Sequence, residues 1–221
     1  MTRTPVLTRL LVALNIIAFI WESLTGAFGQ TTGYHTSHGD VIVYDPLVAH
    51  GAIYGPNVFG LHQYWRVITG SFLHANFLHI LFNMIALWQV GTIVEIIAGT
   101  GRMGFIYFVS MVAAGFSAAW FNYAEPVVGA SGAIFGLFGA LVAIGMRLGP
   151  RGRGLIGQTL PIIAINLVIT FTLPYIAASA HVGGLVAGFI AGLLVYQPPR
   201  PVRARVVDPS TGVEYESTVE P

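Results

Sequence analysis

Six apolar segments, separated by shorter polar stretches, make up most of this chain. Each is long enough to cross a lipid bilayer, which takes about 17 to 25 apolar residues in a helix. The pattern predicts an all-α membrane protein with a six-transmembrane-helix bundle over residues 1–197. The polar, Pro-rich tail at 198–221 is expected to be disordered. The predicted spans are 7–25, 71–98, 103–122, 131–147, 157–174 and 180–197.

The connection between the first two spans is the longest in the chain and is rich in aromatic residues. We predict that this connection, termed loop 1 (residues 26–70), lies in the membrane interface, where Trp and Tyr are enriched. It ends with Trp65 and Arg66, and the arginine is expected either to clamp loop carbonyls or to contact lipid headgroups. We prefer the clamp. The first span lacks a small-residue cleavage site, so we interpret it as a retained helix rather than a signal peptide.

Composition and charge support the membrane interpretation. Hydrophobic residues make up 55% of the chain and charged residues 9%, whereas about 25% charged residues is usual in soluble domains. All ten basic residues are arginines, and nine lie on one side if the N-terminus is cytoplasmic. The positive-inside rule thus predicts a multi-pass cell-membrane protein with both termini in the cytoplasm. A net charge of +1 does not favour nucleic acid binding, and the absence of cysteine excludes thiol catalysis and disulfides.

One serine stands at the start of a predicted helix, in the sequence Gly129-Ala130-Ser131-Gly132. A serine nucleophile needs a base within hydrogen-bond reach, and His181 at the start of the sixth span is the candidate. No carboxylate is placed to orient this histidine, so we predict a Ser-His dyad rather than a triad. The acidic residues near the spans lie elsewhere, at Glu22, Glu95 and Glu125.

A depth argument brings the polar residues together. Ser131, His181 and Asn83 each lie 16 residues before the expected cytoplasmic end of their span. At 1.5 Å per residue this places them at one level, about 24 Å above the inner boundary. His79 lies one turn above Asn83 on the same face, and both could donate to an oxyanion together with the free N–H groups at the start of the Ser131 helix. Alternatively, His79 and Asn83 only bond neighbouring helices.

Two glycine stripes would allow the fourth and sixth spans to pack closely. Such packing would bring His181 to Ser131. The alternative is an inert glycine zipper with an incidental serine. The stripes consist of Gly132, Gly136 and Gly139 on one helix and Gly184, Gly188 and Gly192 on the other.

Taken jointly and in this order, these motifs resemble those of the rhomboid family of intramembrane serine proteases. The resemblance covers Trp65-Arg66, His74 with His79-x-x-x-Asn83, Gly-Ala-Ser-Gly at 129–132, and Ala-His-x-x-Gly-x-x-x-Gly at 180–188, including Gly184 and Gly188.

The resemblance implies that Ser131 is the nucleophile and His181 the general base, then acid. His79, Asn83 and the backbone N–H of Ser131 would form the oxyanion hole. Phe135 stands where many members have a tyrosine stacked on the catalytic histidine. The implied substrates are single-span membrane proteins, cut near the outer end of their helix, within membrane lipid and without a cofactor or metal.

Several alternatives remain open. A catalytically inactive rhomboid-like protein would bind membrane clients, although such proteins typically lack the serine or the histidine. A transporter should show repeats and buried charges. Other intramembrane proteases need a His-Glu-x-x-His helix or two membrane aspartates, and neither is present. No tight ligand spacing supports a metal at the loop histidines, which are His35, His38, His50 and His62.

Overall fold

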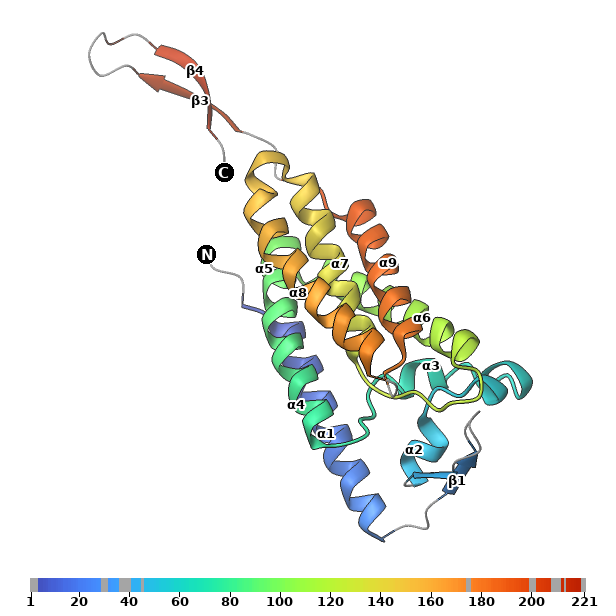
Figure 1. Ribbon diagram of the computed structural model, residues 1–221. Helices are drawn as coiled ribbons and strands as arrows, with labels where there is room; N and C mark the ends of the chain where they lie inside the picture. The colour runs from blue at the N-terminus through green and yellow to red at the C-terminus, as the bar shows by residue number, and fades with distance from the viewer. Residues whose placement is uncertain are drawn as a thin grey trace.

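A computed structural model describes residues 4–28, 32–35, 41–44, 46–173, 176–198, 202–207, 212 and 214–219. Long helices form the body of the molecule, and short helices and one hairpin of loop 1 lie at one end of it (Figure 1). The long helices are α1 (Val6–Phe28), α4 (Phe77–Ala86) continuing through the π-helical segment η2 (Leu87–Gly91) into α5 (Thr92–Ala98), α6 (Thr100–Phe121), α7 (Ser131–Arg147), α8 (Arg153–Thr172) and α9 (Ala178–Val195). The short elements are α2 (Pro46–Gly51), η1 (Pro56–Gly60), α3 (Arg66–Thr69) and η3 (Gly149–Gly152).

Five helical stretches within the described residues are long and apolar enough to cross a membrane. They confirm an α-helical, multi-pass membrane protein. The remaining predicted span, the fourth at 131–147, corresponds to α7, an apolar helix of 17 residues at the centre of the bundle. A full crossing by α7, and with it the six-span count, stays a prediction. The five stretches are Val6–Thr25, Phe77–Ala98, Thr100–Phe121, Gly149–Thr172 and Ala178–Val195.

The second span begins later than the sequence predicts. The prediction placed its start at residue 71, but the helix starts at Phe77. Asn76 is the reason, because its extended backbone breaks the helix and its side-chain oxygen accepts a hydrogen bond from the backbone N–H of His79 at 2.9 Å. An Asn at this position satisfies one of the free N–H groups at a helix start. Residues 71–76 therefore belong to the loop rather than to the span.

The helix α7 lies at the centre of the bundle and packs closely against α9. Most of its side chains are buried, and its neighbours α6, α8 and α9 surround it. A methyl group added to Gly184 would overlap the carbonyl oxygen of Gly132, and one added to Gly188 would overlap that of Gly136. The two helices thus run parallel with their backbones in contact, in a constant register. This contact brings their first residues to the same end of the bundle (Figure 1).

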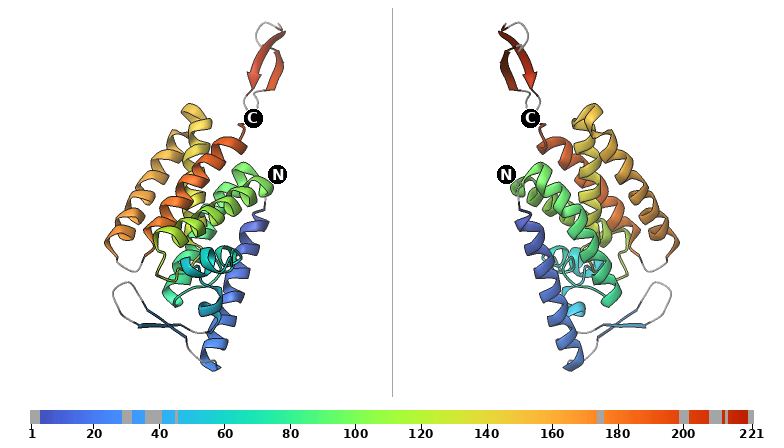
Figure 2. Two further views of the ribbon diagram at one scale, coloured as in Figure 1. Left: turned by 90° about the vertical axis from the view of Figure 1, so that its right-hand side faces the viewer. Right: turned by 90° about the vertical axis from the view of Figure 1, so that its left-hand side faces the viewer.

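A buried carboxylate ties α1 to the rest of the bundle. Glu95 accepts hydrogen bonds from the backbone N–H groups of Leu7 and Thr8, at 2.9 and 2.8 Å, and from the hydroxyls of Thr8 and Thr100. The first N–H groups of a helix have no partner within it, and a negative charge there is favourable. Glu95, which belongs to α5, therefore caps the N-terminus of α1. Figure 2 shows α1 at one edge of the bundle and α8 at the opposite edge.

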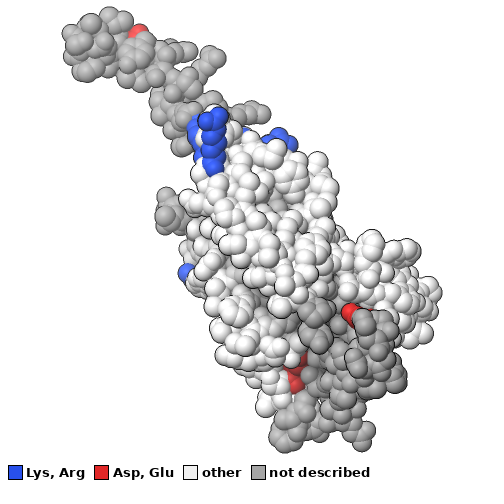
Figure 3. Space-filling view, viewed as in Figure 1, with Lys and Arg blue, Asp and Glu red and all other residues white. Residues whose placement is uncertain are grey.

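The outer surface suits a lipid environment. Large apolar side chains are exposed on several helices, and the face in Figure 3 is almost free of charged side chains between its two ends. In that view arginines gather near the end from which the chain leaves α9. Examples of the exposed apolar side chains are Trp120, Phe121, Val168, Phe171 and Leu194.

Two antiparallel hairpins lie outside the bundle. Strands β1 (Thr32–His35) and β2 (Val41–Tyr44) pair within loop 1. Strands β3 (Val202–Val207) and β4 (Glu214–Val219) pair in the tail, where the sequence predicts disorder. Apolar and charged residues alternate over 202–205 and over 214–216, which favours strands, and Arg205 lies opposite Glu216. The prediction of a disordered tail overlooked this short-period pattern.

The close contact between α7 and α9 leads to a stability prediction. Gly188→Val should lower the free energy of unfolding by about 1–3 kcal/mol or more, because backbone atoms cannot move aside as side chains do. Unfolding in mixed micelles with increasing fractions of denaturing detergent measures this. Gly157→Val is the matched control, since an added Cβ there meets nothing within 4 Å. Equal stability of the two variants would show that the contact does not hold the bundle together.

Candidate functional site

Ser131 and His181 come together at the loop 1 end of the bundle. Ser131 is the first residue of α7, and His181 lies in the first turn of α9. The serine Oγ is 2.8 Å from the Nε2 atom of His181. Because the two helices are parallel and in backbone contact, a short serine side chain is sufficient to reach the histidine.

The other side of His181 is held by a second hydroxyl and by an aromatic ring. Thr170 on α8 has its Oγ1 atom 2.7 Å from Nδ1 of His181. The ring of Phe135 stacks on the imidazole, with a centroid distance of 4.1 Å and an angle of 12° between the planes. The imidazole therefore has both nitrogens hydrogen-bonded and one face covered, which leaves little freedom for rotation.

Sequence reasoning missed Thr170. The chain carries threonines at 159, 170 and 172 in one apolar helix, and no spacing rule distinguishes the one that reaches another helix. The only signal would have been a search for the residue near the C-terminal end of α8 that faces α9.

His79 and Asn83 lie on α4 beside the segment that leads into Ser131. Gly129 in that segment has φ +125°, a conformation that favours glycine. An added Cβ there would lie 2.7 Å from the His79 ring and 3.6 Å from Nδ2 of Asn83. The side chains of His79 and Asn83 therefore both approach the backbone at Gly129. This is expected, because residues four apart lie on the same face of a helix.

Asn83 carries a donor without a partner. Its side chain is buried, and its Nδ2 atom makes no hydrogen bond within the described part of the chain. Buried polar groups without a partner are rare and costly. An unpaired amide beside the Gly129 to Ser131 segment is therefore available to a group that enters the site.

His74 lies behind His79. Its backbone N–H donates to Glu22 of α1 at 3.0 Å, and its ring meets the ring of His79 at a centroid distance of 5.1 Å. Burial, and to a smaller extent the neighbouring His79, lower the pKa of His74 to about 4. His74 is thus neutral at physiological pH, so it adds no charge to the polar cluster of Ser131, His181, His79 and Asn83.

Among the described residues, the loop histidines His50 and His62 and the carboxylates of Glu22 and Glu95 have other surroundings. Within the described residues, no group of three or more His, Asp or Glu side chains could hold a metal ion. His62 bonds the hydroxyl of Tyr64, His50 is exposed, and His38 lies outside the described residues. The carboxylate of Glu95 accepts from the start of α1, and that of Glu22 accepts from the backbone N–H of His74 in the loop before α4. The hydrogen-bond partner of His181 Nδ1 is accordingly a hydroxyl and not a carboxylate.

Arg66 organises loop 1. Its buried side chain donates from Nη1 to the carbonyl oxygens of Ala49 and Ala52 and from Nε to the Gln63 side chain. The guanidinium also lies 5.0 Å from the Trp65 ring centroid. Arg66 therefore joins α2 to α3.

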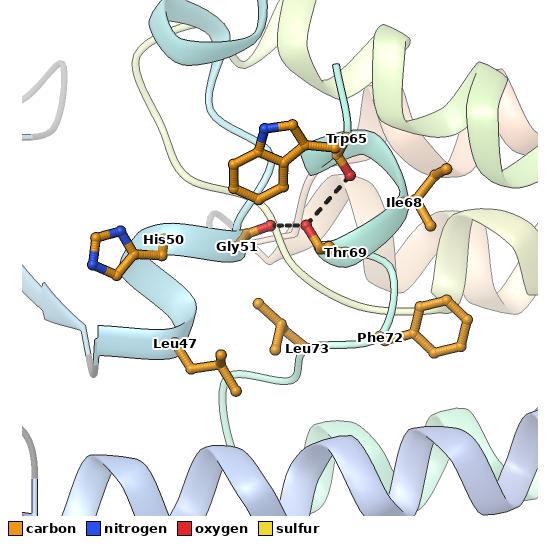
Figure 4. A pocket seen from close by; sticks show the side chains of 8 residues that line it. All are labelled: Leu47, His50, Gly51, Trp65, Ile68, Thr69, Phe72 and Leu73. Carbon is orange, nitrogen blue, oxygen red and sulfur yellow. Dashed lines mark hydrogen bonds between the residues drawn. The ribbon is translucent and has the colours of Figure 1, made fainter. Parts of the chain in front are cut away.

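Loop 1 also contains an apolar hollow of about 310 Å³ between α2 and α3 (Figure 4). The Thr69 hydroxyl bridges its wall by donating to the Gly51 carbonyl at 2.8 Å. None of the four residues of the polar cluster (Ser131, His181, His79 and Asn83) lines it. The hollow is thus separate from the cluster. Its lining residues are Leu47, His50, Gly51, Trp65, Ile68, Thr69, Phe72 and Leu73.

Comparison with known proteins identifies relatives of this chain. Residues 61–198 match the family model described as "Rhomboid domain". Rhomboid protease GluP of Bacillus subtilis is 34% identical over 195 residues, which are 88% of this chain and 36% of that protein. RHOMBOID-like protein 1 of Arabidopsis thaliana is 34% identical over 153 residues, or 68% and 39% of the two chains. Rhomboid protease GlpG of Photorhabdus laumondii is 29% identical over 191 residues, or 85% and 60%. The chain thus matches only part of the length of each of these relatives.

The Arg66 contacts lead to a prediction for loop 1. Arg66→Lys should weaken the loop by about 1–3 kcal/mol, because a lysine cannot donate to two carbonyls and an amide in this fork geometry. Limited proteolysis in detergent micelles should cut residues 46–75 faster than in wild type. Arg153→Lys, at an exposed arginine, is the control and should leave the cutting rate unchanged. If Arg66→Lys were cut as slowly as Arg153→Lys, the clamp role of Arg66 would be contradicted.

Proposed function

The chain belongs to the rhomboid family, and from that premise we propose that it is an intramembrane serine endopeptidase. Its substrates would be single-span membrane proteins, cut near the outer end of their transmembrane helix. The observation that carries the proposal is the 2.8 Å separation of Ser131 Oγ and His181 Nε2 within an apolar helical bundle. A serine becomes a useful nucleophile only when such a base is within hydrogen-bond reach.

In the proposed reaction, Ser131 Oγ attacks the carbonyl carbon of the scissile peptide while its proton passes to His181 Nε2. The carbonyl oxygen becomes an oxyanion in a tetrahedral intermediate. When the C–N bond breaks, His181 returns the proton to the leaving amine, which departs as the first product. Water then attacks the acyl-enzyme with His181 again as base, and the carboxylic acid product leaves as Ser131 regains its proton.

The oxyanion would be held by neutral donors. The backbone N–H of Ser131 is at the start of α7, where helical N–H groups lack a partner and the helix dipole is positive. The unpaired Nδ2 of Asn83 and the ring of His79 border the same segment. Donors set in advance around a developing charge give a large part of the rate in acyl transfer. Neutral donors also cost less to bury in an apolar bundle than a cation would.

We further propose the membrane orientation from the arginines. With both termini in the cytoplasm, the starts of α7 and α9 lie toward the outer face, and the six-helix domain extends over residues 1–197 with a cytoplasmic tail at 198–221. Surrounding lipids and transmembrane substrates are then the partners of the protein. Gly132, Gly184 and Gly188 support the site through the α7–α9 contact, Gly129 supports it through the turn, and Phe135 supports it through the ring stack.

The second candidate function is client binding without catalysis, as in inactive rhomboid-like proteins. The presence of both Ser131 and His181 at hydrogen-bond distance favours the protease.

The protease proposal is tested by cleavage of a tagged single-span substrate in proteoliposomes. Ser131→Ala and His181→Ala should each lower the cleavage rate by about 10³-fold or more, because each removes a group that the other needs. Ser23→Ala and His62→Ala, at exposed positions outside the site, are matched controls and should cleave like wild type.

Cleavage by Ser131→Ala at the wild-type rate would show that the nucleophile is wrongly assigned. If wild type cleaved no substrate of a panel, and a fluorophosphonate probe did not label Ser131, client binding would become the better explanation.

A separate prediction concerns the oxyanion donors. Asn83→Ala should lower kcat by about 10²- to 10³-fold with little change in KM, because the amide would act in the transition state. Its thermal stability should stay close to that of wild type, since the lost donor makes no hydrogen bond in the folded protein. The control is Asn166→Ala on α8, where Nδ2 bonds a carbonyl of its own helix. A loss of stability in Asn83→Ala without loss of kcat would mean that Asn83 is only structural.

A further inference from the structure

The Nδ1 atom of His181 has a partner that none of the motifs includes. Thr170 Oγ1 lies 2.7 Å from Nδ1, and the contact is buried. Thr170 is 2% exposed and His181 is 8% exposed. Water therefore has little access to this nitrogen, and the threonine hydroxyl takes the place that water would otherwise fill.

Thr170 uses its hydroxyl differently from other threonines of α8. The hydroxyls of Thr159 and Thr172 donate to carbonyl oxygens one turn back on the same helix, at 2.7 Å in each case. That bond is the usual way for a hydroxyl to be satisfied within an apolar helix. The Thr170 hydroxyl instead reaches across to α9.

Thr170 is also one of few buried side chains on its helix. Three side chains of α8 are buried, and they lie on one face at Thr159, Ile163 and Thr170. Much of the rest of α8 is exposed at the edge of the bundle. The contact with His181 is thus part of the narrow stripe that joins α8 to the protein, two residues before the helix ends at Thr172.

We propose that Thr170 is a positioning residue that holds His181 in the tautomer and orientation required to accept the proton of Ser131. This inference rests on the proposed protease function and extends it from a dyad to a Ser-His-Thr arrangement.

The chemistry follows from the two nitrogens of a neutral imidazole, of which one donates and the other accepts. For Nε2 to accept from Ser131, the hydrogen must be on Nδ1, where the Thr170 oxygen is in place to accept it. After proton transfer both nitrogens carry hydrogen, and Thr170 still satisfies Nδ1. Without the hydroxyl, Nδ1–H would be a buried donor with no acceptor, which is most costly when the ring is charged.

A hydroxyl suits this position better than the carboxylate of a soluble triad. An isolated carboxylate within an apolar bundle carries a large desolvation cost, whereas a neutral hydroxyl carries a smaller one. A threonine therefore orients the histidine without placing a permanent charge beside it. Because the hydroxyl belongs to α8, the geometry of His181 depends on how this edge helix is seated.

The test compares Thr170→Val, which keeps the shape and removes the hydroxyl, with Thr170→Ser, which keeps the hydroxyl. In proteoliposomes, Thr170→Val should lower kcat by about 10- to 100-fold with KM unchanged, the loss expected from one unpaired buried donor. Thr170→Ser should retain most of the wild-type kcat. Thr159→Val is the matched control, since it makes the same substitution on the same buried face, and it should cleave like wild type.

A readout without substrate accompanies the kinetics. In protein labelled with ¹⁵N-histidine, the nitrogen resonances of His181, assigned by their loss in His181→Ala, report which nitrogen carries the hydrogen. Wild type and Thr170→Ser should show hydrogen on Nδ1, and Thr170→Val should lose this preference. Thermal unfolding of each variant shows whether it is folded.

Equal kcat in wild type and Thr170→Val would overturn the proposal, as would equal losses in Thr170→Val and Thr159→Val. So would a Thr170→Ser variant as slow as Thr170→Val, or an unchanged His181 tautomer in Thr170→Val. The kinetic results presuppose an active wild type, and the tautomer is read without substrate, so both differ from failure of the proposed function. If the proposed protease function fails, wild type itself neither cleaves nor reacts with a fluorophosphonate, and the positioning role of Thr170 is then also refuted.

Discussion

The close approach of α7 and α9 is the contact on which the arrangement of the site depends. Backbone carbonyls of Gly132 and Gly136 lie where side chains would be on Gly184 and Gly188. This fixes both the distance between the helices and their parallel register, because a glycine contact repeats along the pair. Ser131 and His181 lie just beyond the first such contact, so a 2.8 Å separation between short side chains becomes possible. In an apolar solvent, where burial of apolar surface drives helices together only weakly, such packing is a main source of association.

A second constraint is that polar groups inside the bundle need partners. Glu95 meets it by capping α1, and the buried Arg66 meets it by binding carbonyls of loop 1. Asn83 Nδ2 does not meet it, and this donor lies beside the segment that leads to Ser131. Four other buried side-chain atoms also lack a partner within the described residues, but the Asn83 donor borders the proposed oxyanion site. This contrast is typical of functional sites, where local stability is given up for binding.

Much of the fold could be predicted because hydropathy along a membrane chain reports directly on its helices. The start of α7 at Ser131 was predicted to the residue, and the other long helices lie close to their predicted ranges. The start of the second span was wrong, because Ser71 to Asn76 is apolar enough to continue a helix and only the Asn76 cap ends it. The tail hairpin was overlooked because two short strands give a weak signal. Thr170 was missed because its role depends on the rotation of α8 about its own axis.

The sequence by itself determined which segments are helical and apolar, which small residues allow close packing, and where along their helices Ser131, His181 and Asn83 lie. These are local properties, because residue count and the 1.5 Å rise set the position along a helix without knowledge of neighbours. Only the tertiary structure decided which groups meet. Thr170 reaches Nδ1 of His181, Phe135 stacks on its ring, and Gly129 passes close to His79. Those contacts depend on how each helix is rotated about its own axis and on the distance between helices far apart in sequence. Both are set only when backbones and side chains pack together.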